Sequence, residues 1–199
     1  MRKFYIFILL VFCSALCFGQ KPRFVIEAKG NAYYPVGDNF LKDGLENFFG
    51  YGVATEIVFF KNLGVGLEYG EAKTDVKNES VFGSFQNPRL KVYSIYGLYM
   101  VPIGARFETE AMIGYSAMSL KSQPSAGYYY DNFTENGEGI LLGAKFLYGL
   151  TKNSKLQLFV NPRMQFFRSQ KVYFQNDALN DYYAKASLFN VNAGLRFNF

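Results

Sequence analysis

The sequence has 199 residues, half of them hydrophobic, and a formal net charge of +5. That length suits a single domain, and the lack of a Lys/Arg cluster argues against a nucleic-acid interface. The chain contains no histidine. No imidazole is therefore present to activate a serine or to bind a metal, and we expect a non-enzymatic protein without a metal site or cofactor.

The first twenty residues have the features of an export signal. Arg2 and Lys3 precede an apolar run over residues 4–18, and the small Gly19 is followed by the polar Gln20. This order is typical of a cleavable secretory signal peptide. The run is shorter than the roughly 20 residues that span a bilayer, which disfavours the alternative of an uncleaved anchor. We therefore expect cleavage between Gly19 and Gln20.

Cleavage at that point would divide the chain into a signal peptide, 1–19, and one domain, 20–199. Both cysteines, Cys13 and Cys17, would be removed with the signal peptide. Neither follows a small residue, so lipoprotein processing is not expected. The exported domain would then have no disulfide framework, no thiolate catalysis and no cysteine metal site.

The rest of the chain repeats one pattern, in which apolar and polar residues alternate over a segment that ends at turn residues. A period of two puts the two kinds of side chain on opposite faces of a strand. Segments of about ten such residues separated by turns are typical of membrane strands. The predicted strands are 23–34, 48–60, 64–73, 89–101, 105–120, 139–150, 155–168 and 188–199.

The two faces of most predicted strands are easily told apart. The first places Phe24 and Ile26 on one face and Glu27 and Lys29 on the other. The fourth is ambiguous because both of its faces are apolar or aromatic. Its predicted outward residues are Val92, Tyr96, Leu98 and Met100, and its predicted inward residues are Tyr93, Ile95 and Tyr99. In the seventh, Pro162 cannot donate a backbone hydrogen bond, so we expect a bulge or distortion there.

The number of segments is even, and the connections between them alternate between long and short. Short periplasmic turns and longer outer loops are typical of membrane barrels, with both termini on the periplasmic side. Backbone groups in lipid all find partners only if the sheet closes. We therefore predict an all-β fold, a closed eight-stranded antiparallel up-and-down transmembrane β-barrel, preceded by a cleavable signal peptide.

The last segment shows the alternation most clearly, with an aromatic residue at its end. Its apolar positions are Phe189, Val191, Ala193, Leu195, Phe197 and Phe199. Here the chain resembles the small eight-stranded outer-membrane barrels of Gram-negative bacteria, a porin-like group typified by the barrel of outer membrane protein A. The export segment is similar to those of Bacteroidetes. The resemblance implies an outer-membrane location, contact with outer-membrane lipid, and a C-terminal signal read by the barrel-assembly machinery. The residues implied for that signal are Phe189, Val191, Leu195, Phe197 and Phe199.

The predicted inward faces carry both acids and bases. An eight-stranded barrel has room inside only for its own side chains, and charges there are costly unless they are paired. We therefore expect a salt-bridged plug, with an ion path or gate as the alternative. Glu108 and Glu110 could in principle act as an acid–base pair, but no substrate reaches a filled interior. The inward charges are Glu27, Lys29, Glu56, Glu68, Glu108, Glu110, Lys145, Arg163 and Arg196.

Aromatic residues gather in the predicted outer loops. They are Tyr128, Tyr129, Tyr130, Phe133, Tyr173, Phe174, Tyr182 and Tyr183. An interfacial girdle with packed loop bases is the favoured interpretation, and a surface for an extracellular glycan or protein is the alternative. The predicted function is a structural or surface-interaction role through four outer loops. The alternatives are a narrow pore or transporter for a small solute, including a hydrophobic one, and a secreted lipocalin-like barrel with an apolar interior.

Overall fold

The computed structural model of the protein shows a closed antiparallel barrel whose eight strands follow one another in chain order. The structure describes residues 22–60, 62–125, 131–151, 153–169 and 177–199. The strands are β1 Arg23–Val36, β2 Phe48–Phe60, β3 Leu63–Lys73, β4 Phe85–Pro102, β5 Phe107–Pro124, β6 Phe133–Gly149, β7 Leu156–Ser169 and β8 Lys185–Asn198. The predicted all-β, closed eight-stranded antiparallel barrel is confirmed, and the predicted signal peptide lies outside the described residues.

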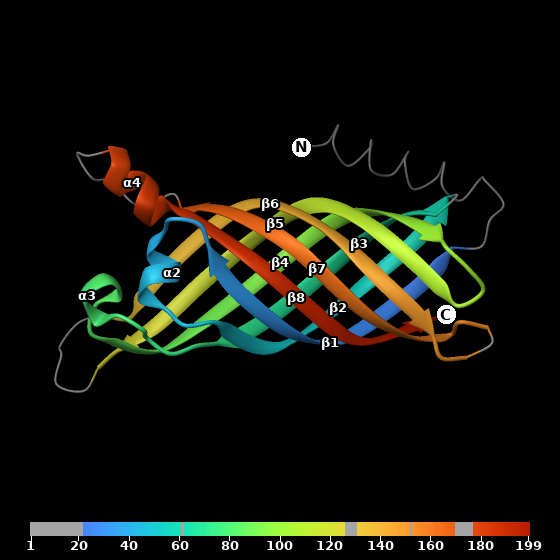
Figure 1. The fold of residues 1–199 in the computed structure, drawn as a ribbon, viewed down its shortest axis with the longest axis horizontal. Coiled ribbons are helices and arrows are strands. Elements are labelled where there is room, and N and C mark those ends of the chain that lie inside the picture. Colours follow the sequence, from blue (N-terminus) through green and yellow to red (C-terminus); the bar gives the residue numbers. More distant parts are fainter. Residues whose placement is uncertain (1–21, 61, 126–130, 152, 170–176) are drawn as a thin grey trace, which may run out of the picture.

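The strands tilt steeply around the long axis of the barrel (Figure 1). The start of β1 and the C-terminus lie at one end, which we call the terminal end. The labelled helices lie at the other end, which we call the loop end. The first and last strands close the sheet, since β1 and β8 pair from Val25↔Asn198 to Val36↔Ser187. Closure removes the unpaired strand edges that would otherwise need another partner.

Several strands extend further toward the loop end than the sequence predicted. β4 begins at Phe85, β5 ends at Pro124 and β6 begins at Phe133. Backbone pairing continues there beyond the alternating apolar residues, because ladder hydrogen bonds do not depend on side-chain polarity. A register shift between β4 and β5 surrounds Asn87, which has a φ of +53°. This bulge accommodates a proline, Pro88, that cannot donate to the ladder.

Pro162 interrupts the sheet without shifting it. The pairing of β6 with β7 stops at Gly143↔Arg163 and resumes at Phe146↔Val160 in the same register. Proline has no N–H to complete the ladder on that side. The predicted irregularity is therefore a local interruption and not a bulge.

The described parts of the long connections at the loop end contain three helices. They are α2 Phe40–Gly44, α3 Glu79–Phe82 and α4 Asp177–Ala184. Asn39 and Asn78 cap α2 and α3, and each side chain accepts a backbone N–H from the first turn of its helix. Such caps satisfy amide groups that a short helix leaves without partners. Among the described residues, no helix combines the length and hydrophobicity needed to span a membrane.

The interior at the loop end is apolar, which the sequence reasoning did not anticipate. The helix residues Phe40, Leu41 and Phe82 pack there against inward residues of the strands. This loop-end core comprises Tyr33, Phe40, Leu41, Leu45, Phe48, Ala72, Phe82, Leu90, Val92, Met118, Leu120, Phe167, Ala186 and Leu188. The helices α2 and α3 thus close one end of the barrel with buried hydrocarbon, and the predicted polar interior is limited to the remainder.

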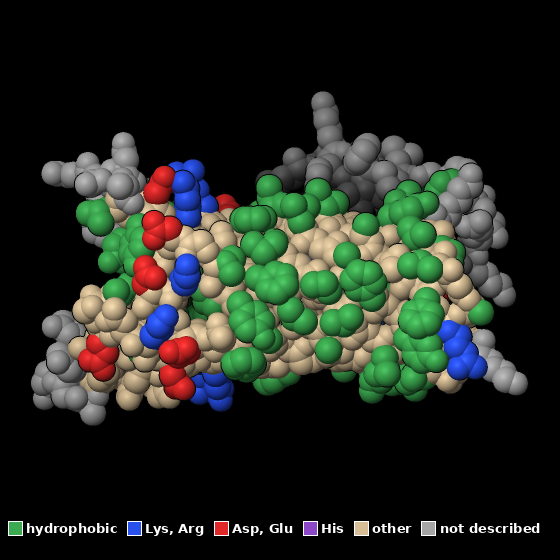
Figure 2. Space-filling view, viewed as in Figure 1, with side chains coloured by type: hydrophobic (Ala, Val, Ile, Leu, Met, Phe, Trp, Pro, Cys, Tyr) green, Lys and Arg blue, Asp and Glu red, His purple; other side chains and the backbone are tan. Residues whose placement is uncertain are grey.

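The outer wall of the barrel is apolar over its middle. Large hydrophobic side chains there are about half exposed, for example Ile26 at 53%, Leu67 at 56% and Ile113 at 63%. They form a broad band across the face shown in Figure 2, and charged side chains gather beside it toward the loop end. An exposed apolar surface of this extent marks a region that contacts an apolar partner or lipid.

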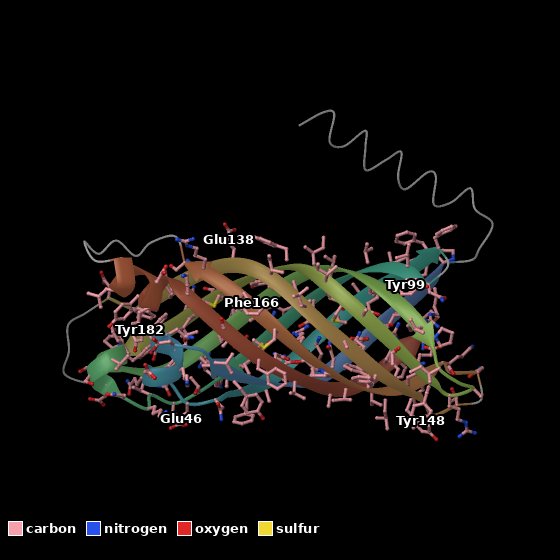
Figure 3. All side chains as sticks on the ribbon, turned by 45° about the horizontal axis from the view of Figure 1, so that its top comes forward. Glu46, Tyr99, Glu138, Tyr148, Phe166 and Tyr182 are labelled. Atoms are coloured by element: carbon pink, nitrogen blue, oxygen red, sulfur yellow. The ribbon has the colours of Figure 1, made fainter. Side chains whose placement is uncertain are left out.

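The predicted orientation of the fourth strand is wrong. Val92, Tyr96, Leu98 and Met100 are buried inside the barrel, whereas Tyr93, Ile95 and Tyr99 are 52%, 55% and 48% exposed on the outer wall. Figure 3 shows Tyr99 projecting outward near the terminal end. The inward face carries the polar contacts of β4. Ser94 Oγ lies 2.7 Å from Ser116 Oγ of β5. The Tyr96 hydroxyl donates a hydrogen bond to Glu56 of β2.

This orientation predicts different reactivities for two neighbouring cysteines. In a background with serine at the native cysteine positions 13 and 17, Ile95→Cys should react readily with a lipophilic maleimide. Ser94→Cys should react far more slowly, because Ser94 is only 6% exposed inside the barrel. Labelling rates of the folded, detergent-solubilised variants measure the difference. The opposite order of rates would restore the orientation inferred from the sequence.

Candidate functional site

The inward charges form two buried groups in the part of the barrel that the loop-end core leaves. The Lys145 cluster consists of Glu27, Glu56, Glu110, Lys145 and Arg196. The Glu68 cluster consists of Lys29, Glu68 and Arg163. The exposed fraction of each of these residues is 6% or less. Eight of the nine inward charges expected from the sequence are thus brought together.

The Lys145 cluster is built around one ammonium group. Lys145 Nζ lies 2.5 Å from Glu27 Oε1, 2.6 Å from Glu56 Oε1 and 3.3 Å from Glu110 Oε2. The guanidinium of Arg196 contacts the same three carboxylates, with N–O distances of 3.6 Å to Glu27, 3.1 Å to Glu56 and 2.5 Å to Glu110. Three acids therefore share two bases, and each carboxylate is compensated from two sides. Such pairing is what makes ionised groups tolerable away from water.

The Glu68 cluster has the opposite composition, with one acid between two bases. Arg163 donates to both carboxylate oxygens of Glu68, one of these bonds at 2.6 Å. Lys29 Nζ lies 2.5 Å from Glu68 Oε2. The arrangement is a bidentate pair with one further cation, the strong form of a charge-assisted contact.

The formal charges of the two clusters balance each other. With all groups ionised, the Lys145 cluster carries −1, from three acids and two bases, and the Glu68 cluster carries +1, from one acid and two bases. The clusters adjoin each other along β1, since Glu27 and Lys29 are two residues apart on one face of that strand. The eight charges sum to zero, which limits the cost of burying them.

The ninth expected charge lies apart from the clusters. Glu108 is half-buried and its carboxylate accepts a hydrogen bond from Gln157 Nε2 at 2.9 Å. Its cationic partner is Arg23, at 3.7 Å. Arg23 is a base that the sequence reasoning missed. Continuing the alternation of β1 back from Glu27 by four residues would have placed it on the inward face.

Tyr96 and Gly66 complete the wall of the Lys145 cluster. The Tyr96 hydroxyl donates to Glu56 Oε1 at 2.8 Å and its ring is buried. Gly66 leaves room for that ring, since a Cβ there would lie 2.4 Å from two ring carbons of Tyr96. A glycine on β3 therefore allows a β4 tyrosine to reach a β2 glutamate.

Gly66→Ala is expected to lower the free energy of unfolding by about 1–3 kcal/mol, the usual cost of overpacking a filled interior. Gly97→Ala is the matched control, because a Cβ there would meet its nearest atom at 3.9 Å. Urea midpoints of the two variants, read from the mobility of unboiled protein on a gel, measure the difference. Identical midpoints would show that the Tyr96 ring can move aside at no cost.

The charged groups of this interior are engaged with one another. Each carboxylate of the two clusters contacts a cation, and the ammonium of Lys145 occupies the space between three carboxylates that a metal ion would need. Within the described residues, no group of three or more His, Cys, Asp or Glu side chains is arranged to hold a metal ion. The geometry supplies electrostatic cohesion between strands that are not neighbours in the sheet.

The other expected site residues lie on the outside or beyond the described part of the chain. Phe189, Leu195, Phe197 and Phe199 are 36%, 39%, 43% and 73% exposed on the outer wall at β8, and Val191 is half-buried beside them. The cleavage residues Gly19 and Gln20 lie outside the described residues.

The described loop aromatics pack against the helices at the loop end. Phe133 lies 5.2 Å from Phe82 between ring centroids, and Tyr183 lies 5.8 Å from Phe40. The Tyr182 hydroxyl donates to an aspartate of α2 at 2.9 Å, and partial burial together with this carboxylate raises its pKa to about 12. These contacts favour packed loop bases over a free aromatic surface. Residues 128–130, 173 and 174 lie outside the described residues.

Comparison with known proteins shows structural similarity to solved structures. No protein-family model matches the sequence, and no curated protein matches it either. A major outer membrane protein from Thermus thermophilus matches with a TM-score of 0.63 and 15% identity, over 90% of this chain and 100% of that one. Neisserial surface protein A matches with a TM-score of 0.55 and 15% identity, over 90% of this chain and 100% of that one. Ail, the attachment invasion locus protein of Yersinia pestis, matches with a TM-score of 0.50 and 11% identity, over 88% of this chain and 97% of that one.

At these identities the likeness is one of fold. The chain has the closed eight-stranded architecture of small outer-membrane β-barrels, as its sequence resemblance predicted. The matches cover the whole of each of these two chains, so the shared architecture is the entire barrel.

Proposed function

We propose that the protein is a non-enzymatic integral outer-membrane barrel that acts structurally or by surface interaction through its four loop-end connections. The observation that carries the proposal is the division of side chains by the barrel wall. Hydrophobic side chains are about half exposed outside, while eight charges are buried and ion-paired inside. A membrane strand is expected to show this arrangement, apolar toward lipid and polar toward the lumen.

The orientation and the export route belong to the same proposal. Residues 1–19 would be the signal peptide, the terminal end would face the periplasm, and the loop end would face outward. The outward aromatic residues of β8, ending at Phe199, would be the part of the chain that the barrel-assembly machinery recognises. Short connections at the terminal end and longer ones at the loop end support this orientation.

The structure gives the two alternative functions less support. A route for a small hydrophobic solute would need apolar inward residues such as Tyr93, Ile95 and Tyr99, but all three lie on the outer wall. A lipocalin-like barrel needs an apolar ligand cavity and a polar exterior. Here the two clusters fill one part of the interior with paired charges, and helices α2 and α3 fill the loop end with hydrocarbon.

A ligand at the loop end would be an extracellular glycan or protein. Ail from Yersinia pestis has been solved in complex with the heparin analogue sucrose octasulfate, a precedent for ligand binding by a barrel of this fold. In the present chain, the connections that carry α2, α3 and α4 would form the contact surface. Their described aromatic residues are engaged in packing, so polar loop residues would make most contacts.

Membrane fractionation and gel mobility test the membrane placement. The protein should be recovered with the outer membrane, and unboiled protein should migrate differently from boiled protein, as folded barrels do. Recovery as a soluble protein without detergent would overturn the proposal in favour of the lipocalin-like alternative.

Planar-bilayer recordings test the filled interior. Purified protein that shows the mobility shift should produce no steady conductance, because paired charges and the loop-end core occupy the lumen. Reproducible unitary currents from such protein would favour the pore instead.

A further inference from the structure

Charged residues of β3 to β8 lie on the outer wall on the loop-end side of its apolar band. Figure 2 shows lysine, arginine, aspartate and glutamate side chains there, next to the hydrophobic middle. The strand residues of this charged belt are Glu71, Lys73, Arg89, Lys91, Lys121, Glu138, Arg168 and Lys185. Under the membrane placement proposed above, this belt lies at the level of lipid headgroups.

Three cations of the belt are direct cross-strand neighbours. Lys73 on β3 pairs with Arg89 on β4, and Arg89 pairs with Lys121 on β5. All three side chains are exposed, and none forms an ion pair with a residue in the described part of the chain. Like charges opposite one another in a sheet repel and destabilise it. This cationic row is therefore unfavourable for folding unless an external anion compensates it.

A similar pair elsewhere in the belt is compensated within the protein. Arg168 on β7 and Lys185 on β8 are also direct neighbours. Arg168 pairs on its other side with Glu138, and Lys185 Nζ lies 2.6 Å from Asp181. The lack of compensation is thus a property of the cationic row and not of cations in this belt generally.

A shallow groove of about 410 Å³ lies beside the cationic row, on the outer wall of β4, β5 and β6. It is lined by Tyr93, Ala117, Met118, Ser119, Asn136, Gly137 and Glu138. Its lining residues Ser119 and Asn136 belong to the pairing Lys91↔Ser119↔Asn136, which is two residues along the strands from Arg89↔Lys121, so the groove begins directly beside the cationic row. The groove exists because the small Ala117 and Ser119 of β5 face outward there, between the larger Tyr93 and Glu138. Figure 3 shows Glu138 projecting from the outer wall.

The cationic row and the groove differ in chemistry, and together they suit one kind of ligand. Lysine and arginine side chains bind phosphate oxygens, and arginine does so with two parallel hydrogen bonds. The groove is largely apolar, with the ring of the β4 tyrosine and the methyl group of the β5 alanine facing into it. Its volume is within the range of about 300–1,000 Å³ that is usual for ligand sites. The one acid lining it, Glu138, lies at the edge away from the cationic row and accepts a hydrogen bond from Tyr115.

We propose that this surface binds one anionic, phosphate-bearing lipid, with the phosphate at Lys73, Arg89 and Lys121 and an acyl chain in the groove. The inference rests on the proposed membrane placement, because only then do the row and the groove meet a headgroup and a chain together. Each basic residue near a membrane surface contributes on the order of 1 kcal/mol toward anionic lipid. The bound lipid would also relieve the repulsion within the row.

Lipid affinity of the folded barrel tests the headgroup site. The probes are dioleoyl phosphatidylglycerol, which is anionic, and dioleoyl phosphatidylcholine, which is zwitterionic, titrated into detergent-solubilised protein and followed by native mass spectrometry. Arg89→Gln with Lys121→Gln should weaken phosphatidylglycerol binding about 30-fold, which corresponds to about 2 kcal/mol. The control removes the compensated pair, Arg168→Gln with Lys185→Gln, and should change the affinity less than about 3-fold.

A second variant tests the groove. Ala117→Phe should weaken dioleoyl phosphatidylglycerol and leave short-chain dihexanoyl phosphatidylglycerol unchanged, because only the long chain occupies the groove. Equal losses for both double variants, or equal binding of the two dioleoyl lipids by the original protein, would overturn the proposal. Equal affinity for the dioleoyl and dihexanoyl lipids would reduce the site to an anion site and overturn it as a lipid site.

The outcome is separable from that of the membrane placement. If the protein gives no heat-dependent mobility shift in detergent and is soluble without it, the placement itself fails. If the protein forms the shifted barrel but shows no preference for the anionic lipid, only the lipid site fails.

Discussion

Lys145→Met is expected to lower the free energy of unfolding by about 3–5 kcal/mol, the usual cost of removing one partner from a buried ion pair. Lys145 contacts three carboxylates and is fully buried. Without its ammonium, three acids would remain with Arg196 as their only close cation in the cluster. A methionine side chain has a similar length, so the loss is one of charge and hydrogen bonding more than of packing.

Urea unfolding of the detergent-solubilised barrel, followed by the fraction of the fast-migrating band on unboiled gels, measures this loss. The matched control is Lys155→Met, since Lys155 is exposed in a connection at the terminal end. Exposed substitutions of this kind usually change stability by less than about 0.5 kcal/mol. If both variants unfold at the same urea concentration, the Lys145 cluster does not contribute to stability, and our interpretation of the interior is wrong.

The faces of seven of the eight predicted strands followed from residue alternation alone. In β1, for example, Phe24 and Ile26 lie outside and Glu27 and Lys29 inside, as the period of two predicts. Because one row of such a strand is apolar and the other is charged, alternation determines which row faces the interior. The same rule brought the inward charges to the interior without any knowledge of their partners.

Alternation failed at β4 because both rows of that strand are apolar. Its orientation follows from its neighbours: Ser94 pairs with the inward Glu68 on one side and with the inward Ser116 on the other. Ser94 is the one small polar residue at the centre of the strand, and it was the available signal. Weighing it above the hydrophobicity of Tyr96 and Leu98 would have given the correct face.

The partners within the two clusters could not be predicted from the sequence. Lys145 and Glu27 are separated by 118 positions in the chain and meet across the interior. Which charges meet depends on the register of all the intervening strand pairs. Residue alternation shows which face of a strand a side chain lies on, but it does not show which residues pair across neighbouring strands. The loop-end core was missed for a related reason, because the residues of α2 and α3 lie in stretches whose polar composition indicated open loops.

The Glu68 cluster permits a test in which a second substitution restores stability. Glu68→Gln removes the one carboxylate between Lys29 and Arg163, and leaves two buried cations facing each other. We expect it to lower the free energy of unfolding by about 3–5 kcal/mol. Adding Lys29→Met should recover part of this loss, because the cluster then regains its original net charge of +1 with a single cation, Arg163.

The expected order of urea midpoints is therefore the original protein, then Glu68→Gln with Lys29→Met, then Glu68→Gln alone. Independent sites would instead give additive losses, with the double variant the least stable of the three. Lys29→Met alone leaves the bidentate pair of Glu68 with Arg163 intact and should cost about 1.5–3 kcal/mol, the value of one hydrogen bond to a charged group. If the double variant unfolds before Glu68→Gln does, charge balance does not govern the stability of this interior. Burial and shape would then account for it.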